Sequence, residues 1–308
     1  MKRLLVTGSN GLLGQKITDA LLNDKNILLE YVASSRGSNR HLKKDGYVYI
    51  DLDITDHGQV KKVIEHYMPD IIINTAAMAN VDSCERNPED SYKVNVEAVA
   101  NLIRICEKQG IHLVHLSTDF VFDGEEGPYT EEDLPNPVNI YGKHKWEAEQ
   151  LLQSASCPWS IVRTILVYGI VSDLSRSNIV LWAKNALEKG EKIRVVNDQW
   201  RMPTLAEDLA KACLAIAERQ SEGIFHISGK DFFSICEIVE AVVEHYRLDT
   251  TFICKENSSA LHQDAVRPKR TGFILDKAYE QLDYIPHSFG EGLKLIDEQL
   301  NNIQKRKG

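Results

Sequence analysis

The sequence of 308 residues contains few cysteines and no cysteine pair of the kind that binds metal. Its six cysteines are scattered without a C-x-x-C motif, which fits reduced thiols better than a zinc site or a disulfide framework and predicts no bound metal. It also lacks an apolar run long enough to cross a bilayer, and the apolar stretch after Lys2-Arg3 is too short for a signal peptide. We therefore expect a cytoplasmic protein that does not bind membranes.

Basic residues are outnumbered by acidic ones. The 36 Lys and Arg residues against 45 Asp and Glu residues give a formal net charge of −9. This balance opposes a general affinity for nucleic acid, so an anionic ligand must be held by local positive charge. No low-complexity tract is present, and a content of 43% hydrophobic residues suffices for a large buried core.

The first fourteen residues, MKRLLVTGSNGLLG, form the most informative stretch of the chain. An apolar run ends at Thr7-Gly8 and a leucine-rich segment follows at once, which predicts a buried strand turning directly into a helix. Glycines at this spacing, between a strand and a helix, are typical of a loop that binds the pyrophosphate of a dinucleotide. The predicted contacts in this loop are Gly8, Asn10, Gly11, Leu12, Leu13 and Gly14.

Apolar periodicity then alternates between strands and helices along the chain. The predicted strands are residues 27–34, 47–52, 70–77, 112–118, 159–167 and 223–228, and the predicted helices are residues 12–24, 60–67, 91–109, 141–153 and 205–219. Repeated βαβ units of this length predict an α/β fold of the Rossmann type, a doubly wound parallel sheet with a smaller mixed α/β lobe that binds substrate. We assign residues 1–169 and 204–228 to the NAD(P)-binding domain and residues 170–203 and 229–308 to the smaller lobe.

The residues after the second predicted strand bear on the choice of cofactor. An NAD enzyme usually has a carboxylate there for the ribose 2′-hydroxyl, whereas this chain has Ser34-Ser35-Arg36. Hydroxyls beside an arginine suit a 2′-phosphate, so we predict NADPH, with NADH as the other possibility. The alternative is that Arg36 is a surface loop residue. Asp53 and Ile54, after the third strand, are candidates for the adenine site or for ordinary loop solvation.

A Tyr-x-x-x-Lys spacing marks the candidate catalytic site. Tyr141 and Lys145 lie one helical turn apart, so the ammonium is expected to lower the pKa of the phenol and favour proton transfer. Thr118, at the end of a predicted strand, supplies a third hydroxyl, and Asn95 is a candidate for a proton relay through water. Each feature alone also fits a surface residue, but the four in this order favour an enzyme.

At this point the chain resembles the extended short-chain dehydrogenase/reductases, and among them the dTDP-4-dehydrorhamnose reductase family. The resemblance runs nearly from end to end. It is carried by VTGSNGLLG, Asn74-Thr75-Ala76-Ala77, Val81-Asp82 with Glu85, Asn95, STDFVFDG, Tyr141 and Lys145 with Glu149, Arg163-Thr164, Tyr168-Gly169, Val196-Asn197-Asp198-Gln199, Pro203-Thr204 and Arg267-Pro268.

This resemblance implies that a hydride passes from NADPH to the C4 ketone of a nucleotide-linked 6-deoxy-4-keto sugar. By the same resemblance, Tyr141 protonates the forming alkoxide, Lys145 holds the nicotinamide ribose, and Thr118 hydrogen-bonds the carbonyl oxygen. The cofactor site then also includes Ser35, Arg36, Asp53, Ile54, Ala76, Ala77, Asn95, Tyr141 and Lys145.

The chain departs from the family pattern mainly where the family binds the sugar. Phe120 replaces a Tyr, Ile165-Leu166 replace a Ser-Trp pair, Met78-Ala79 replace a Tyr-Thr pair, and Arg201 replaces a Gly. For the substrate diphosphate we favour Arg267, which Pro268 would stiffen and which can pair bidentately with phosphate. Arg201 is the second candidate. The predicted substrate contacts are Met78, Val81, Phe120, Leu166, Arg201 and Arg267.

Two other functions remain open from the sequence. An epimerase or 4,6-dehydratase of the same superfamily is one, although the Thr-Asp-Glu motif of the dehydratases reads Thr118-Asp119-Phe120 here. A non-catalytic relative is the other, because similar chains serve as NADP-binding regulatory subunits of methionine adenosyltransferase. A homodimer is possible. The sequence does not identify the sugar, the nucleotide or the pathway partners.

Overall fold

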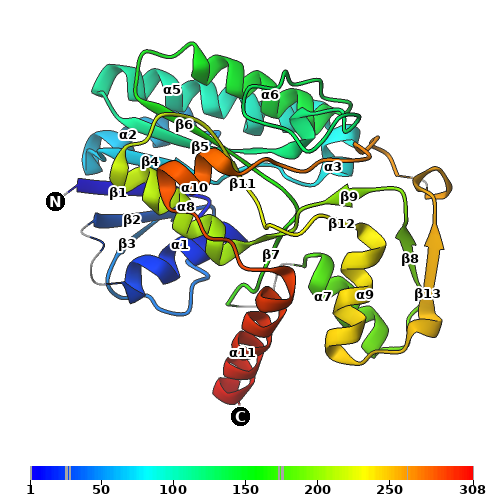
Figure 1. The fold of residues 1–308 in the computed structure, drawn as a ribbon. Helices are drawn as coiled ribbons and strands as arrows, with labels where there is room; N and C mark the ends of the chain where they lie inside the picture. The colour runs from blue at the N-terminus through cyan, green and yellow to red at the C-terminus, as the bar shows by residue number, and fades with distance from the viewer. Residues whose placement is uncertain are drawn as a thin grey trace.

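A computed structural model describes residues 2–24, 27, 29–172, 174, 177–261 and 263–307. Within these residues, seven parallel strands form one twisted sheet in the order β11-β6-β5-β4-β1-β2-β3 (Figure 1). The strands are β1 (Lys2–Thr7), β2 (Leu29–Ser35), β3 (Val48–Asp51), β4 (Ile71–Asn74), β5 (His112–Thr118), β6 (Trp159–Thr164) and β11 (Gly223–Ile227). The chain order reverses between β1 and β4, where ligands bind in sheets of this topology.

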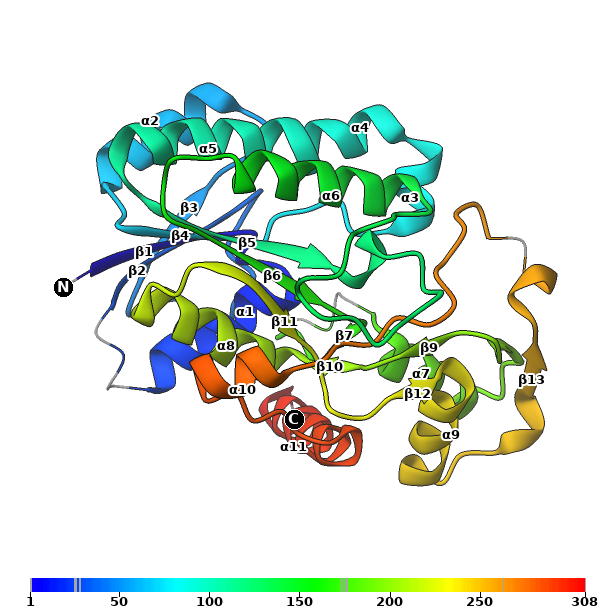
Figure 2. The ribbon, with the colours of Figure 1, turned by 45° about the horizontal axis from the view of Figure 1, so that its top comes forward.

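Helices cover both faces of this sheet (Figure 2). One face carries α2 (His57–Tyr67), α5 (Ala98–Gln109) and α6 (Ile140–Gln153), and the other carries α1 (Leu12–Asn23), α8 (Ala206–Arg219) and α10 (Asp276–Leu282). Short helices α3 (Val81–Arg86) and α4 (Pro88–Tyr92), a π-helical turn (Lys93–Glu97) and a 3₁₀ turn (Asp119–Val121) complete this part of the chain.

Alternate residues of each strand supply the two cores between these layers. Leu4 and Val6 of β1 join the cluster under α1 and α8, whereas Leu5 joins the cluster under α2, α5 and α6. Ile71–Ile73 of β4 are fully buried. Strands buried on both faces read as continuous apolar runs, which is why the sequence pattern identified β4.

A smaller lobe lies beyond the carboxyl ends of the strands (Figure 1). It contains α7 (Ile179–Glu188), α9 (Ile235–Tyr246), α11 (Phe289–Lys307) and short strand pairs, and has its own apolar core. The pairs are β8 (Ile193–Val196) with β13 (Ile253–Glu256), β9 (Trp200–Arg201) with β12 (Phe233–Ser234), and β7 (Val167–Tyr168) with β10 (Thr204–Leu205); 3₁₀ turns span Thr250–Phe252 and Ser258–Ala260.

The predicted Rossmann-type sheet with a smaller lobe is confirmed. The division of the chain into two domains stays a prediction. One segment of the predicted lobe of residues 229–308 packs against the large sheet and not within the lobe. Phe273, Leu275, Ala278 and Leu282 pack in the core of the large sheet, not in that of the lobe. We therefore group α10 with the dinucleotide domain.

Several predicted boundaries were wrong by a few residues. The strand predicted at 27–34 is described from Leu29 to Ser35, and Leu28 lies outside the described residues. Helix α2 starts three residues before its predicted start because Asp56 caps it, accepting a hydrogen bond from the N–H of Gln59. The strand predicted at 159–167 stops at Thr164 because Leu166 has a φ of +40°.

Candidate functional site

The loop after β1 forms a cradle against the end of β4. Gly8 has a φ of +73°, and a Cβ there would lie 2.7 Å from the backbone N of Ala76. Gly14 lets α1 pack closely, because a Cβ there would lie 2.5 Å from the Cα of Ser9. The N-cap residue, Gly11, provides no side-chain hydrogen bond to α1. The first N–H groups of this helix are therefore available to an anion.

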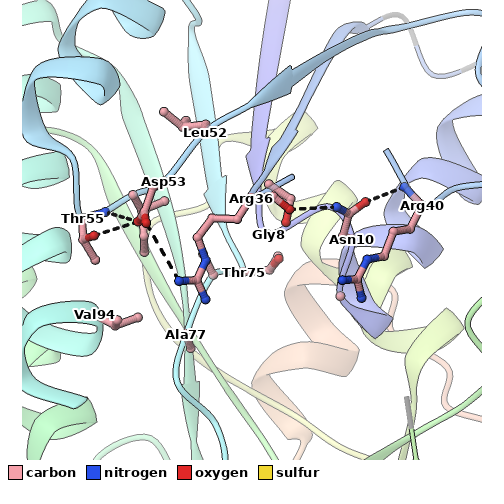
Figure 3. A pocket seen from close by; sticks show the side chains of 14 residues that line it. Gly8, Asn10, Arg36, Arg40, Leu52, Asp53, Thr55, Thr75, Ala77 and Val94 are labelled. Carbon is pink, nitrogen blue, oxygen red and sulfur yellow. Dashed lines mark hydrogen bonds and ion pairs between the residues drawn. The ribbon is translucent and has the colours of Figure 1, made fainter. Parts of the chain in front are cut away.

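A cavity of about 240 Å³ opens beside this loop (Figure 3). Its lining includes these predicted cofactor contacts: Gly8, Asn10, Gly11, Ser35, Arg36, Asp53, Ile54, Ala76 and Ala77. Its lining also includes residues that the sequence reasoning missed: Arg40, Leu52, Thr55, Thr75 and Val94. Leu12, Leu13 and Gly14 lie in the first turn of α1. The cavity therefore joins the glycine loop to the ends of β2, β3 and β4.

Two arginines from the loop after β2 line the cavity. The side chain of Arg36 is 78% exposed, and its Nη1 lies 3.9 Å from a carboxylate oxygen of Asp53. Arg40 lines the same cavity on the side of the glycine loop (Figure 3). Arg40 follows Arg36 by four residues, but spacing within a loop does not determine which side chains line a cavity, so no sequence signal identified Arg40.

Asn10 fixes the loop that carries both arginines. Its buried side chain donates from Nδ2 to the carbonyl of Ser38 and to the hydroxyl of Tyr49, each at 3.0 Å. Its Oδ1 accepts from the N–H of Arg40 at 2.8 Å. Asn10 therefore holds the arginine loop against the glycine loop before any ligand binds.

The three candidate catalytic residues lie at the end of β5 and the start of α6, and a hydrogen bond joins two of them, Thr118 and Tyr141. Thr118 is the last residue of β5, while Tyr141 and Lys145 lie in the first turns of α6. Asn139 caps that helix by accepting from the N–H of Gly142 at 2.8 Å. Thr118 and Lys145 are buried, and Tyr141 is partly exposed.

The pKa of Tyr141 differs from the sequence expectation. Burial raises the pKa of this phenol above its usual value, a hydrogen bond with Thr118 works in the opposite direction, and the charge of Asp119 raises the pKa further. The expected lowering by Lys145 is not found because the Lys145 amine is directed to another partner. A phenol that stays protonated at neutral pH is suited to donate a proton.

Lys145 is buried against a histidine. Its Nζ lies 2.9 Å from Nε2 of His115, a buried residue of β5. Burial lowers the pKa of Lys145 from 10.5 to about 8, although the carboxylate of Glu149 favours the charged form. The amine is therefore close to changing its charge near physiological pH.

Asn95 holds a backbone segment, and its role in a proton relay through water stays a prediction. Its Oδ1 accepts from the N–H of Met78 at 3.0 Å, and its Nδ2 donates to the carbonyl of Met78 at 3.0 Å and to Ser91 at 3.2 Å. These bonds fix the chain after β4, which lines the cofactor cavity at Ala76 and Ala77. In this arrangement Asn95 shapes the site through the backbone.

Phe120 lies beside the candidate catalytic residue Tyr141. Its ring lies edge-on to Tyr141 with centroids 6.1 Å apart, and the guanidinium of Arg201 lies 5.5 Å from the Phe120 ring centroid. Phe120 therefore stands between the proposed proton donor and a buried cation. A tyrosine at this position would present a hydroxyl that this chain lacks.

Arg201 is engaged with protein groups on all sides. It is buried, it donates to the carbonyls of Trp200, Pro268 and Lys269, and its Nε lies 3.6 Å from Asp119. These contacts tie the lobe to the end of β5. They leave Arg201 a weaker candidate for the substrate diphosphate than the sequence suggested.

Arg267 is paired with a carboxylate of α3. Its Nη2 lies 2.6 Å from Oδ2 of Asp82 and its Nη1 lies 3.1 Å from Oδ1. This bidentate pair lowers the pKa of Asp82. The Arg267 side chain is 17% exposed, so it lies close to the surface. The pair with Asp82 holds its guanidinium at a fixed position.

The remaining predicted substrate contacts follow strands β4 and β6. Met78 follows β4 and is partly buried, and Val81 begins α3 next to Asp82. Leu166 adopts its left-handed backbone conformation where β6 ends, and its side chain packs against the cores of both the sheet and the lobe. These positions stay predictions for substrate contact.

The described residues lack two features, a membrane-spanning helix and a metal site. None of their helices is both long and apolar enough to cross a membrane. The described part of the chain also contains no group of three or more His, Cys, Asp or Glu side chains placed to hold a metal ion.

Comparison with known proteins places these features in a family. Residues 1–302 match the family described as RmlD substrate binding domain. The chain is 31% identical to methionine adenosyltransferase 2 subunit beta of Danio rerio, over 87% of this chain and 81% of that protein. It is also 31% identical to the "probable low-salt glycan biosynthesis reductase Agl14" of Haloferax volcanii, over 86% and 87% of the two chains.

Solved structures of reductases are also similar to this chain. A dTDP-4-dehydrorhamnose reductase of Clostridium acetobutylicum superposes with a TM-score of 0.83 at 30% identity, covering 97% of this chain and 99% of the other. A dTDP-4-dehydrorhamnose reductase of Bacillus anthracis in complex with NADP has a TM-score of 0.83 at 26% identity, with coverage of 97% and 100%. The sequence resemblance is thereby confirmed, and the chain belongs to the family of the RmlD substrate binding domain.

Proposed function

We propose that this protein reduces the 4-keto group of a nucleotide-linked 6-deoxy-4-keto sugar, with NADPH as the cofactor. The observation that supports the proposal is that Thr118, at the end of β5, is hydrogen-bonded to Tyr141 of α6, the helix that also carries Lys145, while a dinucleotide cradle lies at the switch point of the same sheet. The reductases of similar structure, one of them in complex with NADP, support the same assignment.

The residues of the cradle fit a dinucleotide with a 2′-phosphate. The close approach at Gly8 and the uncapped start of α1 suit a pyrophosphate. Arg36 and Arg40 line the cavity beside Ser35, which stands after β2 where NAD enzymes usually carry a carboxylate, and the nearby carboxylate of Asp53 is paired with Arg36. Bound NADPH would supply the hydride for the reduction.

The protein groups then have separate tasks in the reaction. Tyr141 donates its phenolic proton to the sugar oxygen as negative charge develops there, and its raised pKa keeps that proton in place beforehand. Thr118 donates a hydrogen bond to the same oxygen. Lys145 holds the ribose of the cofactor next to the sugar.

Substrate recognition is proposed to rest on the lobe and on α3. Arg267 is placed to pair with the diphosphate, because its guanidinium is close to the surface and oriented by Asp82. Phe120, Met78, Val81 and Leu166 form the proposed apolar surroundings of the sugar, which suits a 6-deoxy sugar better than a fully hydroxylated one.

A non-catalytic role is the second candidate, because the methionine adenosyltransferase subunit of Danio rerio is as similar to this chain as the Haloferax reductase is. That role requires a nucleotide site but does not require Thr118, Tyr141 and Lys145 together.

The test is consumption of NADPH, followed at 340 nm as is usual for nicotinamides, with a panel of nucleotide-linked 4-keto sugars. Turnover with a 6-deoxy-4-keto sugar supports the proposal. Tight NADPH binding without turnover of any sugar in the panel would favour the regulatory role, and loss of both would contradict the dinucleotide assignment.

A further inference from the structure

A line of buried polar side chains crosses the sheet from the glycine loop to the candidate catalytic lysine. Thr7, Asn74 and His115 occupy paired positions on neighbouring strands β1, β4 and β5. The Thr7 hydroxyl lies 2.6 Å from Oδ1 of Asn74, Nδ2 of Asn74 lies 3.1 Å from Nδ1 of His115, and Nε2 of His115 lies 2.9 Å from Nζ of Lys145. Each residue is at most 2% exposed.

We propose that His115 is a positioning residue that holds Lys145 and whose ring tautomer is coupled to the charge of Lys145. The proposal rests on the proposed function only for the effect of this coupling on catalysis. The coupling itself follows from the hydrogen bonds, because a neutral imidazole has one donor and one acceptor nitrogen.

The direction of each bond fixes the tautomer. When Asn74 donates from Nδ2 to Nδ1 of His115, the ring proton is on Nε2 and faces Lys145. A neutral amine accepts this proton, whereas an ammonium cannot. The ammonium form instead requires Nε2 as acceptor, the ring proton on Nδ1, and the Asn74 amide turned to present its oxygen. The ammonium form of Lys145 therefore permits only one arrangement of the whole line, and the second arrangement becomes accessible when the amine is neutral.

The surroundings keep His115 neutral in both arrangements. Burial lowers the pKa of His115 well below its usual value, and the nearby charge of Lys145 lowers it further. The other titratable groups that act on Lys145 are the carboxylate of Glu149 and the thiol of Cys84. Since His115 is not charged, its ring nitrogen can orient Lys145 without adding a second positive charge to the site.

The chain offers a matched control on the same strand. His112 is also fully buried, and its Nε2 lies 2.7 Å from the hydroxyl of Ser160, away from Lys145. Replacement of either histidine removes a buried ring and its hydrogen bond, so both variants share the general cost of such a change. Only a change at His115 should affect Lys145.

The first measurement uses nitrogen NMR of the histidine rings in the protein without cofactor, as a function of pH. We expect the ring proton of His115 to move between Nδ1 and Nε2 near pH 8, where Lys145 changes its charge, and we expect no such change in a Lys145→Met variant. One tautomer across the whole range in the wild-type protein would overturn the coupling, whether or not the protein reduces a sugar.

The second measurement compares His115→Leu, His115→Gln and His112→Gln. We expect His115→Leu to lower kcat by about tenfold or more and to displace the basic limb of the pH profile. The amide of His115→Gln restores most of the rate because it can still accept from Lys145, and His112→Gln stays within about twofold of wild type. If replacements at positions 112 and 115 lower kcat equally and leave the pH profiles unchanged, His115 contributes only packing and the proposal is wrong.

Discussion

Burial governs the chemistry of the candidate catalytic residues. The pKa of Lys145 falls to about 8 because its ammonium is removed from water, with Glu149 opposing the effect. An unfolded chain would hold that proton up to a pKa near 10.5. Between these two values the unfolded state binds more protons than the native state, so this residue makes the folding free energy more favourable as pH rises.

This linkage predicts a measurable difference between the wild-type protein and Lys145→Met. From pH 7 to pH 10, the free energy of unfolding of the wild type should rise by about 2 kcal/mol relative to that of the variant, since one pKa unit corresponds to about 1.4 kcal/mol. Chemical denaturation at several pH values gives both quantities. Lys143→Met is the control, because Lys143 is exposed on the same helix. A parallel pH dependence in all three proteins would show that Lys145 is not desolvated.

Cofactor choice is also decided by single side chains. Arg36→Ala or Arg40→Ala should weaken NADPH binding by about 1.5 to 3 kcal/mol each, as for a hydrogen bond between charged groups, and leave NADH binding almost unchanged. Fluorescence titration of both cofactors measures the two dissociation constants. Lys44→Ala is a suitable control in the same loop, because Lys44 is exposed and does not line the cavity. Equal losses for NADPH and NADH would refute the 2′-phosphate assignment.

Motif spacing was enough to identify Arg36, Tyr141 and Lys145 as candidates. It was not enough to find Arg40 in the cavity or His115 beside Lys145, because these contacts depend on the path of a loop and on the pairing of strands. The sign of the pKa shift of Tyr141 was missed for the same reason: spacing gives a neighbour on the helix, whereas burial depends on the whole fold.

Among the elements, the β1–α1 turn is tightly constrained by backbone contacts. A Cβ at Gly14 would lie 2.6 Å from the carbonyl oxygen of Gly8 and 2.5 Å from the Cα of Ser9. Backbone atoms cannot rotate away as the end of a flexible side chain can, so the turn itself would have to shift.

Gly14→Ala should therefore destabilise the protein by about 1 to 3 kcal/mol and weaken dinucleotide binding. Gly290→Ala is the matched control in α11, because no atom lies within 4 Å of a Cβ built there. That change should be neutral or slightly stabilising, since alanine is favoured over glycine in a helix. Thermal unfolding of both variants decides the point, and an unaffected Gly14→Ala protein would mean that the turn is looser than described.

Long periodic elements were predictable, and the short ones were not. Strand β5 was predicted with both ends correct, and Gly110 ends α5 in the left-handed conformation as expected of a C-cap. The two-residue strands β7, β9, β10 and β12 carry no periodic signal, because two residues are too few to show a period and each strand pairs with one that is distant in the sequence. The π-helical turn at 93–97 interrupts a predicted continuous helix without any Pro or Gly to mark it.

On the scale of the whole molecule, one segment of the lobe is fastened to the dinucleotide domain beside the site. Arg267 pairs with Asp82, and Asp264 pairs with Arg86, so residues 264–267 are held at both ends on α3. The N–H of Ala265 also donates to Asp82 at 3.2 Å. The position of this segment therefore depends on contacts between the two parts of the molecule. The same contacts position Arg267, the residue that we propose binds the substrate diphosphate.

Arg267→Ala should raise KM for a nucleotide sugar by about tenfold or more, which corresponds to about 1.4 kcal/mol, with little change in kcat if the contact is equally strong in the ground and transition states. Steady-state kinetics with the substrate found in the panel would measure both constants. Lys269→Ala, an exposed cation two residues away, should leave KM within about twofold. If the two variants behave alike, Arg267 does not bind the diphosphate.

The central claim is that Tyr141 delivers the proton in an NADPH-dependent reduction. Its most direct test is single-turnover reduction of the sugar by Tyr141→Phe, with the NADPH dissociation constant measured on the same preparation. We expect the dissociation constant to stay within about twofold of wild type while the rate falls by about two to four orders of magnitude, as for a removed general acid. A Tyr141→Phe protein that reduces the sugar at nearly the wild-type rate would contradict the mechanism.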